Sequence, residues 1–136
     1  NDVISFPDYP AEIRAPAGTL AGVSAFDLSF SSIEIYTTAD YLEVLVAMNP
    51  AALKANLKDL EKGGILIVNS DSFAENDLRK AEYKVNPLES GELNDYRLVQ
   101  IPITKLTLKA VEETGLSHRD GARCKNFFAL GVVKSK

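Results

Sequence analysis

Residues 43–70 read EVLVAMNPAALKANLKDLEKGGILIVNS, and this stretch decides the fold. Two uniformly apolar runs, Val44–Met48 and Ile65–Val68, are typical of strands that are buried on both faces of a sheet. Between them, three leucines recur at the period of an amphipathic helix: Leu53, Leu57 and Leu60. A strand, a helix and a second strand form a βαβ unit. The sequence therefore predicts an α/β fold built on a mostly parallel, Rossmann-like sheet with flanking helices.

The two ends of the predicted helix carry their own signals. Asn49 is a good N-cap, and Pro50 has its backbone preset for the first helical position. Gly63-Gly64 is predicted to end the helix, because glycine accepts the left-handed conformation of a C-cap. Asn49 also follows a strand, at the edge where parallel sheets bind ligands, and a helix start suits an anion. The alternative is that Asn49 only caps the helix, as many asparagines do.

Alternating and apolar runs predict further elements around this unit. Val3–Phe6 is predicted to be a short strand, and Gly22–Phe30 and Ile33–Thr37 alternate in the manner of an antiparallel hairpin. Tyr96–Ile101 is predicted to be another strand. A final helix is predicted over Ser117–Val133. Its second half is apolar nearly all round, so we expect it to be buried or covered by a partner.

The composition is that of an ordinary globular domain. The 136 residues suffice for one domain with a core, and 46% of them are hydrophobic and 25% charged. A net charge of -4 argues against nucleic acid as a main partner, because binding phosphates needs a basic face. No apolar run approaches the ~18 residues of a membrane span, and no signal peptide is visible. The single Cys124 and single His118 exclude an internal disulfide and a His-based metal cluster. A cytoplasmic protein fits these counts.

The segment from Phe6 to Gly22 is the strongest candidate for contact with a ligand or a partner. It contains three prolines and little apolar content, with Glu12 and Arg14 near its middle. A guanidinium can hold a carboxylate or a phosphate through paired hydrogen bonds. The alternative is an ordinary surface loop, whose two charges are solvated or form an ion pair within the fold.

Residue types for catalysis are scarce. Cys124 is predicted to be an inert, packed thiol. The one imidazole that could activate it is on His118, six residues earlier, and only residues three or four apart face each other on a helix. Asn126 stands out on the same apolar helix, because a buried amide would need partners. The sequence contains no G-x-G-x-x-G, G-x-x-x-x-G-K-[ST], H-E-x-x-H or G-x-S-x-G. We therefore expect either a non-catalytic α/β module or one part of a shared active site.

Four motifs, in order, resemble the gamma domain of 2-oxoacid:acceptor (ferredoxin) oxidoreductases. They read FPDYPAEIRAPAGT, then LVAMNPAALKANL with DL and KGGILIVN, then PITKLTL, then RCKN with FALG. The resemblance covers about Ser5 to Val133. It is closest to the 2-oxoglutarate type, in which this domain is fused ahead of the alpha domain. The ordered series of four motifs is specific, whereas the NP and GG pattern alone is not.

The resemblance implies an enzyme that converts a 2-oxoacid such as 2-oxoglutarate, with coenzyme A, to an acyl-CoA and carbon dioxide, and that passes two electrons to ferredoxin. It implies thiamine diphosphate with magnesium and iron–sulfur clusters as cofactors. These would be held by the alpha and beta parts of the complex and not by this chain. The gamma domain is expected to contribute to assembly and to the region that closes over coenzyme A and the thiamine site.

Five residues become candidate contacts through the resemblance, and none of them is expected to be catalytic. Glu12, Arg14 and Gly18 match the family's E-x-R loop with its following glycine. Asn49 matches the asparagine of the family's strand-end N-P, and Asn126 lies in the RCKN motif. The expected contacts are with coenzyme A or with an interface.

The chain departs from the family at its start, because family members carry a glycine-rich strand–loop–helix segment upstream. Residues 1–136 are therefore expected to form a single gamma-type domain that lacks this unit, to be a fragment of a longer chain and to be inactive alone. Two other hypotheses stay open. One is a nucleotide-dependent, methyltransferase-like domain. Such a domain needs a glycine loop and an acidic residue that binds the ribose, and the sequence shows neither in the right order. The other is a docking module, which the apolar final helix favours.

Overall fold

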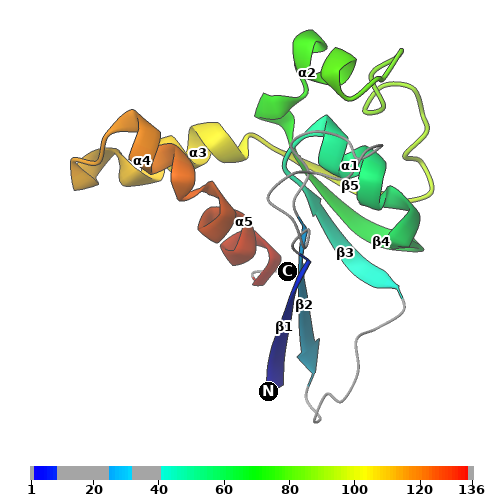
Figure 1. Cartoon of the computed structure of the whole chain (residues 1–136), viewed down its shortest axis with the longest axis horizontal. Coiled ribbons are helices and arrows are strands. Elements are labelled where there is room, and N and C mark those ends of the chain that lie inside the picture. Colours follow the sequence, from blue (N-terminus) through cyan, green and yellow to red (C-terminus); the bar gives the residue numbers. More distant parts are fainter. Residues whose placement is uncertain (1, 9–24, 32–40, 135–136) are drawn as a thin grey trace.

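The larger sheet of the protein consists of three parallel strands in the order β3-β4-β5 (Figure 1). The computed structural model describes residues 2–8, 25–31 and 41–134. The strands are β3 (Leu42–Ala47), β4 (Leu60–Asn69) and β5 (Arg97–Ile101). The helices are α1 (Pro50–Asn56), α2 (Glu75–Lys80), α3 (Ile103–Val111), α4 (His118–Arg123) and α5 (Lys125–Lys134). The predicted α/β fold, with a parallel sheet flanked by helices, is confirmed.

A separate antiparallel pair lies near the amino terminus. It consists of β1 (Asp2–Asp8) and β2 (Ala25–Ser31). The strand predicted over Val3–Phe6 is confirmed, and the one predicted to end at Phe30 is confirmed from residue 25 onward. The hairpin partner predicted at Ile33–Thr37 lies outside the described residues, and among the described strands β2 pairs with β1.

The central strand β4 divides its side chains between two apolar clusters. Leu66 and Val68 belong to a cluster that α1 and the segment after α2 complete, with Leu53 fully buried at its centre. Ile67 belongs to a cluster on the other face, which Ile103 and α5 complete. The remaining apolar residues of this second cluster are only partly buried: Val44, Val46, Met48, Ile65, Val99, Ile101, Phe128, Val132 and Val133. Both faces of the sheet are thus covered, as predicted, but the second less completely.

Helix α1 begins as predicted and ends earlier than predicted. Asn49 caps it, because the side-chain oxygen accepts a hydrogen bond from the backbone N–H of Ala52 at 2.7 Å. The helix ends at Asn56, and β4 already begins at Leu60 after one 3-10 turn. The predicted helix end at Gly63-Gly64 is therefore wrong. The leucine spacing could not separate a third helical turn from the first residue of a strand.

The two glycines instead form an irregularity in β4. Leu42 pairs with Leu60, whereas Val44 pairs with Ile65, so the residues in between bulge out of the register. Gly63 has a φ of 81°, which only glycine adopts without strain, and its N–H donates to the carbonyl of Asp95 at 2.8 Å.

Helices α3, α4 and α5 follow β5 and together form what we call the C-terminal arm. In Figure 1, α3 and α4 project to the left of the sheet, and α5 returns toward it. Ser117 caps α4, as predicted, by accepting from the N–H of Asp120 at 3.2 Å. The predicted single helix over Ser117–Val133 is wrong, because the helix is interrupted at Cys124. The N–H of Cys124 donates to the carbonyl of Gly121, in a tighter turn than that of an α-helix. None of the helices in the described ranges is long and apolar enough to cross a membrane.

Candidate functional site

The carboxyl edge of the parallel sheet presents two asparagines from neighbouring strands. Asn49 follows β3 by two residues, and Asn69 is the last residue of β4. Such an edge is the usual place for a ligand in an open parallel sheet. The two side chains nevertheless have structural roles, and each is tied to a helix start.

Asn49 is a half-buried cap. Its side-chain oxygen accepts the bond from Ala52, its own carbonyl accepts the N–H of Leu53 at 3.2 Å, and its φ of -155° places it in the extended region that suits a cap. The capping alternative is thus realised in the structure. Any contact of Asn49 with coenzyme A stays a prediction.

Asn69 is fully buried and fully hydrogen-bonded. Its Nδ2 donates to the hydroxyl of Ser72 at 2.9 Å and to the hydroxyl of Thr104 at 3.0 Å. Its Oδ1 accepts the backbone N–H of Thr104 at 3.4 Å. A buried amide with all its groups paired fixes one geometry, so this residue holds the start of α3 against the end of β4.

The amino end of α3 is held a second time by Asp71. Its Oδ2 accepts the backbone N–H of Lys105 at 2.9 Å, whereas the N-cap position itself is Pro102, which offers no side-chain cap. A carboxylate at a helix start satisfies an orphan N–H and complements the helix dipole. This helix end is therefore occupied by the chain's own anion.

Sequence reasoning missed Asn69, Asp71 and Thr104 as a connected group. The available signal was an asparagine directly after a buried strand, which is the same signal that singled out Asn49. The partner Thr104 lies 35 residues away, and no local pattern points to it.

The other predicted site residues are not gathered at this edge by any described contact. Glu12, Arg14 and Gly18 lie outside the described residues, so their roles stay predictions. Asn126 lies on α5 and is exposed, so its amide needs no buried partner. Its expected contact with coenzyme A or with an interface stays a prediction.

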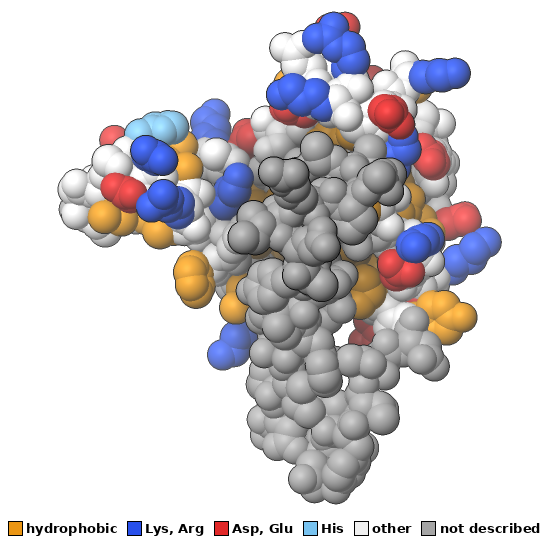
Figure 2. Space-filling model, viewed as in Figure 1, with side chains coloured by type: hydrophobic (Ala, Val, Ile, Leu, Met, Phe, Trp, Pro, Cys, Tyr) orange, Lys and Arg blue, Asp and Glu red, His pale blue; other side chains and the backbone are white. Residues whose placement is uncertain are grey.

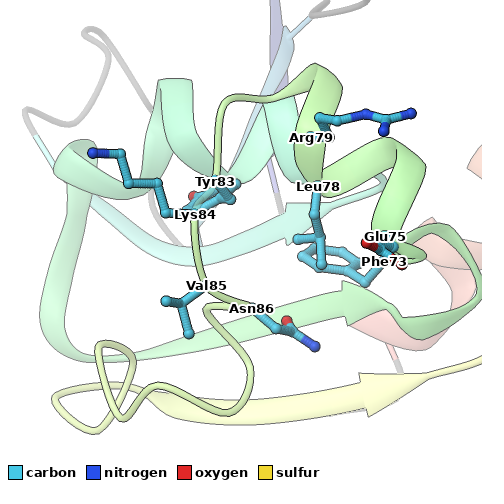
Figure 3. Close-up of a pocket in the computed structure, with 8 residues that line it drawn as sticks. All are labelled: Phe73, Glu75, Leu78, Arg79, Tyr83, Lys84, Val85 and Asn86. Atoms are coloured by element: carbon cyan, nitrogen blue, oxygen red, sulfur yellow. The ribbon is translucent and has the colours of Figure 1, made fainter.

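A shallow pocket of about 450 Å³ lies between α2 and the segment that follows it (Figure 3). Figure 3 shows Phe73 beside Leu78, whereas the charged ends of Arg79 and Lys84 point away from the hollow. Its lining residues are Phe73, Glu75, Leu78, Arg79, Tyr83, Lys84, Val85 and Asn86. The lining holds no nucleophile paired with a base.

Tyr83 is the one group in the described residues with a clearly shifted pKa. Burial raises the pKa of its phenol to about 12, and the negative charge of Glu92 acts in the same direction. The ammonium of Lys54 lies 5.4 Å from the centre of its ring. The phenol is therefore a hydrogen-bond donor at neutral pH and not a base.

The described residues do not suit the cofactors that the four motifs imply. Iron–sulfur clusters are held by several cysteine thiolates, and this chain has one cysteine. Among the described residues, no group of three or more His, Cys, Asp or Glu side chains could hold a metal ion. Binding of thiamine diphosphate through magnesium would therefore need ligands from outside the described residues.

Two comparisons with known proteins agree with each other. A family model described as pyruvate ferredoxin/flavodoxin oxidoreductase matches residues 1–135. The 2-oxoglutarate oxidoreductase subunit KorA of Mycobacterium tuberculosis (strain ATCC 25618 / H37Rv) is 57% identical to this chain over 133 residues. The match covers 98% of this chain and 20% of that protein, so the chain spans about a fifth of the length of this relative. Neither comparison supports the methyltransferase-like alternative.

Proposed function

This chain belongs to the pyruvate ferredoxin/flavodoxin oxidoreductase family, and from this premise we propose that it is the gamma-type domain of a 2-oxoglutarate:ferredoxin oxidoreductase. The resemblance that the four motifs indicated is thereby confirmed at the level of the family. The single observation that carries the proposal is the 57% identity across nearly the whole chain to a protein named for 2-oxoglutarate.

The proposed enzyme converts 2-oxoglutarate and coenzyme A to the acyl-CoA and carbon dioxide, and it passes two electrons to ferredoxin. Thiamine diphosphate and iron–sulfur clusters would supply the decarboxylation and electron transfer from other domains. This domain contributes assembly and the closure of the coenzyme A region.

The substrate is tested with the assembled enzyme that contains this domain. Ferredoxin reduction is followed with coenzyme A and either 2-oxoglutarate or pyruvate. We expect kcat/KM for 2-oxoglutarate to be at least about tenfold higher, since a site that pairs the second carboxylate rejects an acid that lacks it. Absence of coenzyme A-dependent reduction with both acids would overturn the proposal.

The role of the loop is tested with Arg14→Ala in the same enzyme. We propose that Arg14 holds a phosphate of coenzyme A, so the variant should raise KM for coenzyme A and leave the unfolding temperature unchanged. Arg79→Ala is the matched control, because Arg79 is exposed and its guanidinium bonds to Asn76 of its own helix. Equal KM values in both variants would remove the loop from the coenzyme A site.

A further inference from the structure

Helix α5 has one packed face and one exposed face. Phe128, Ala129, Val132 and Val133 pack in the cluster on the second face of the sheet. The opposite positions recur at helical spacing, and we call them the outer face of α5: Asn126, Phe127, Leu130, Gly131 and Lys134. Among the described residues, the fold covers this helix on one side only.

The outer face of α5 is apolar where a solvent-exposed helix face is normally polar. Phe127 is 79% exposed and Leu130 is 40% exposed. They are three residues apart and are therefore neighbours on the helix surface. At Gly131 an added Cβ would meet no atom within 4 Å, so another chain could approach the backbone closely there. Aromatic residues such as Phe127 are enriched at protein interfaces.

The C-terminal arm is basic, although the chain as a whole is acidic. Residues 103–134 contain six Lys and Arg against three Asp and Glu, for a net charge of +3, whereas the chain carries -4. Helix α5 contains no acidic residue, and its lysines form no ion pair with any described residue. Figure 2 shows basic and hydrophobic side chains side by side on this arm. A partner that fits this surface is acidic around an apolar centre.

We propose that the outer face of α5 docks onto an acidic, partly apolar surface of another domain or subunit of the oxidoreductase, with Phe127 as the central anchor. This inference rests on the proposed function. The KorA relative has about four fifths of its length outside the matched region, and a tethered domain docks through a small surface at high effective concentration. A second copy of this chain also offers acidic surface, with a net -7 outside the arm, but it lacks the tether that raises the effective concentration of a neighbouring domain.

Photo-cross-linking in the assembled enzyme tests the partner. A benzophenone analogue of phenylalanine is placed at position 127, and at position 62 as the control, because Lys62 is exposed and lies outside the arm. We expect position 127 to cross-link to an acidic segment of another domain or subunit, and position 62 to give no such product. A cross-link to the same domain of a second copy, or no cross-link at all, overturns the inference.

Amide hydrogen exchange in the same enzyme gives an independent readout. The double variant Phe127→Ser, Leu130→Ser should exchange at least about tenfold faster across residues 125–134 than the parent, while the domain core stays unchanged. Val85→Ser, which removes a side chain that is 64% exposed elsewhere, should not change exchange in α5. Unchanged exchange in the double variant would contradict docking.

Turnover of the same enzyme is measured as well, so that failure of the proposed function can be distinguished from failure of the docking inference. If the parent enzyme oxidises no 2-oxoacid, the proposed function fails whatever the cross-link shows. If it oxidises 2-oxoglutarate and the cross-link and exchange results are negative, only the docking inference fails.

Discussion

Asn69 and Thr104 join the end of β4 to the start of α3 through a buried amide–hydroxyl hydrogen bond of 3.0 Å. Thr104 returns its backbone N–H to the same asparagine at 3.4 Å. The bond spans 35 residues of sequence and fixes where the C-terminal arm leaves the sheet.

Asn69→Ala should lower the free energy of unfolding by about 1–3 kcal/mol, because it leaves Ser72 and Thr104 without their partner in a partly buried place. Urea unfolding measures the loss. Asn76→Ala is the matched control, because Asn76 is exposed and bonds to Arg79 of its own helix. Equal midpoints for the two variants would show that the buried amide does not hold the arm.

Leu53→Ala should cost about 2–5 kcal/mol of stability, because the side chain is fully buried in the cluster beneath α1. Leu57→Ala should cost about 1 kcal/mol, because Leu57 is only partly buried. Thermal or urea unfolding of the pair checks the order. A larger loss at Leu57 would mean that the helical spacing, rather than the observed burial, describes the core.

Gly64→Ala should destabilise the protein by about 1–3 kcal/mol through overpacking. An added Cβ would lie 2.8 Å from the carbonyl oxygen of Glu61 and 3.0 Å from that of Glu43, and neither backbone atom can move freely. Gly131→Ala is the contrasting variant, because its Cβ meets open space in a helix, and it should gain about 0.5–1 kcal/mol. Equal changes in the free energy of unfolding for Gly64→Ala and Gly131→Ala would contradict this account.

Tyr83 should make stability fall at high pH. Its pKa is about 12 in the folded protein against 10.0 for the ordinary group, so the unfolded chain loses the proton first. The contribution is complete below pH 10.0 and is lost as pH rises toward about 12. Stability measured from pH 9 upward should therefore fall more steeply in the parent than in Tyr83→Phe. Parallel curves for the two proteins would show that the phenol is not desolvated.

The sequence was sufficient for the βαβ unit because its signals are local. Uniform apolar runs identified β3 and β4, and the Asn49-Pro50 pair identified the start of α1. The end of α1 was not predictable in the same way. Leucines at 53, 57 and 60 fit both a longer helix and a strand that begins at Leu60, and Gly63 fits both a C-cap and a bulge. Tertiary pairing with β3 decides between them.

The candidate site was predictable only in part. Asn49 was located at the sheet edge from its own neighbours, whereas the role of Asn69 depends on Thr104, far along the chain. Asn126 stood out because an amide on an apolar helix would need partners if it were buried, and the structure shows it exposed. Composition could not show which side of α5 the sheet covers, because most positions from Phe127 to Val133 are apolar.

The bonds made by Asn69 and Asp71 also limit how this fold can diverge. Both side chains form hydrogen bonds with backbone or hydroxyl groups of the domain itself, so a new ligand could bind them only if those bonds were broken. A related protein that used the junction of β4 and α3 as a binding pocket would first have to acquire other residues that hold the start of α3. Substitutions should therefore accumulate in this domain away from the junction of β4 and α3.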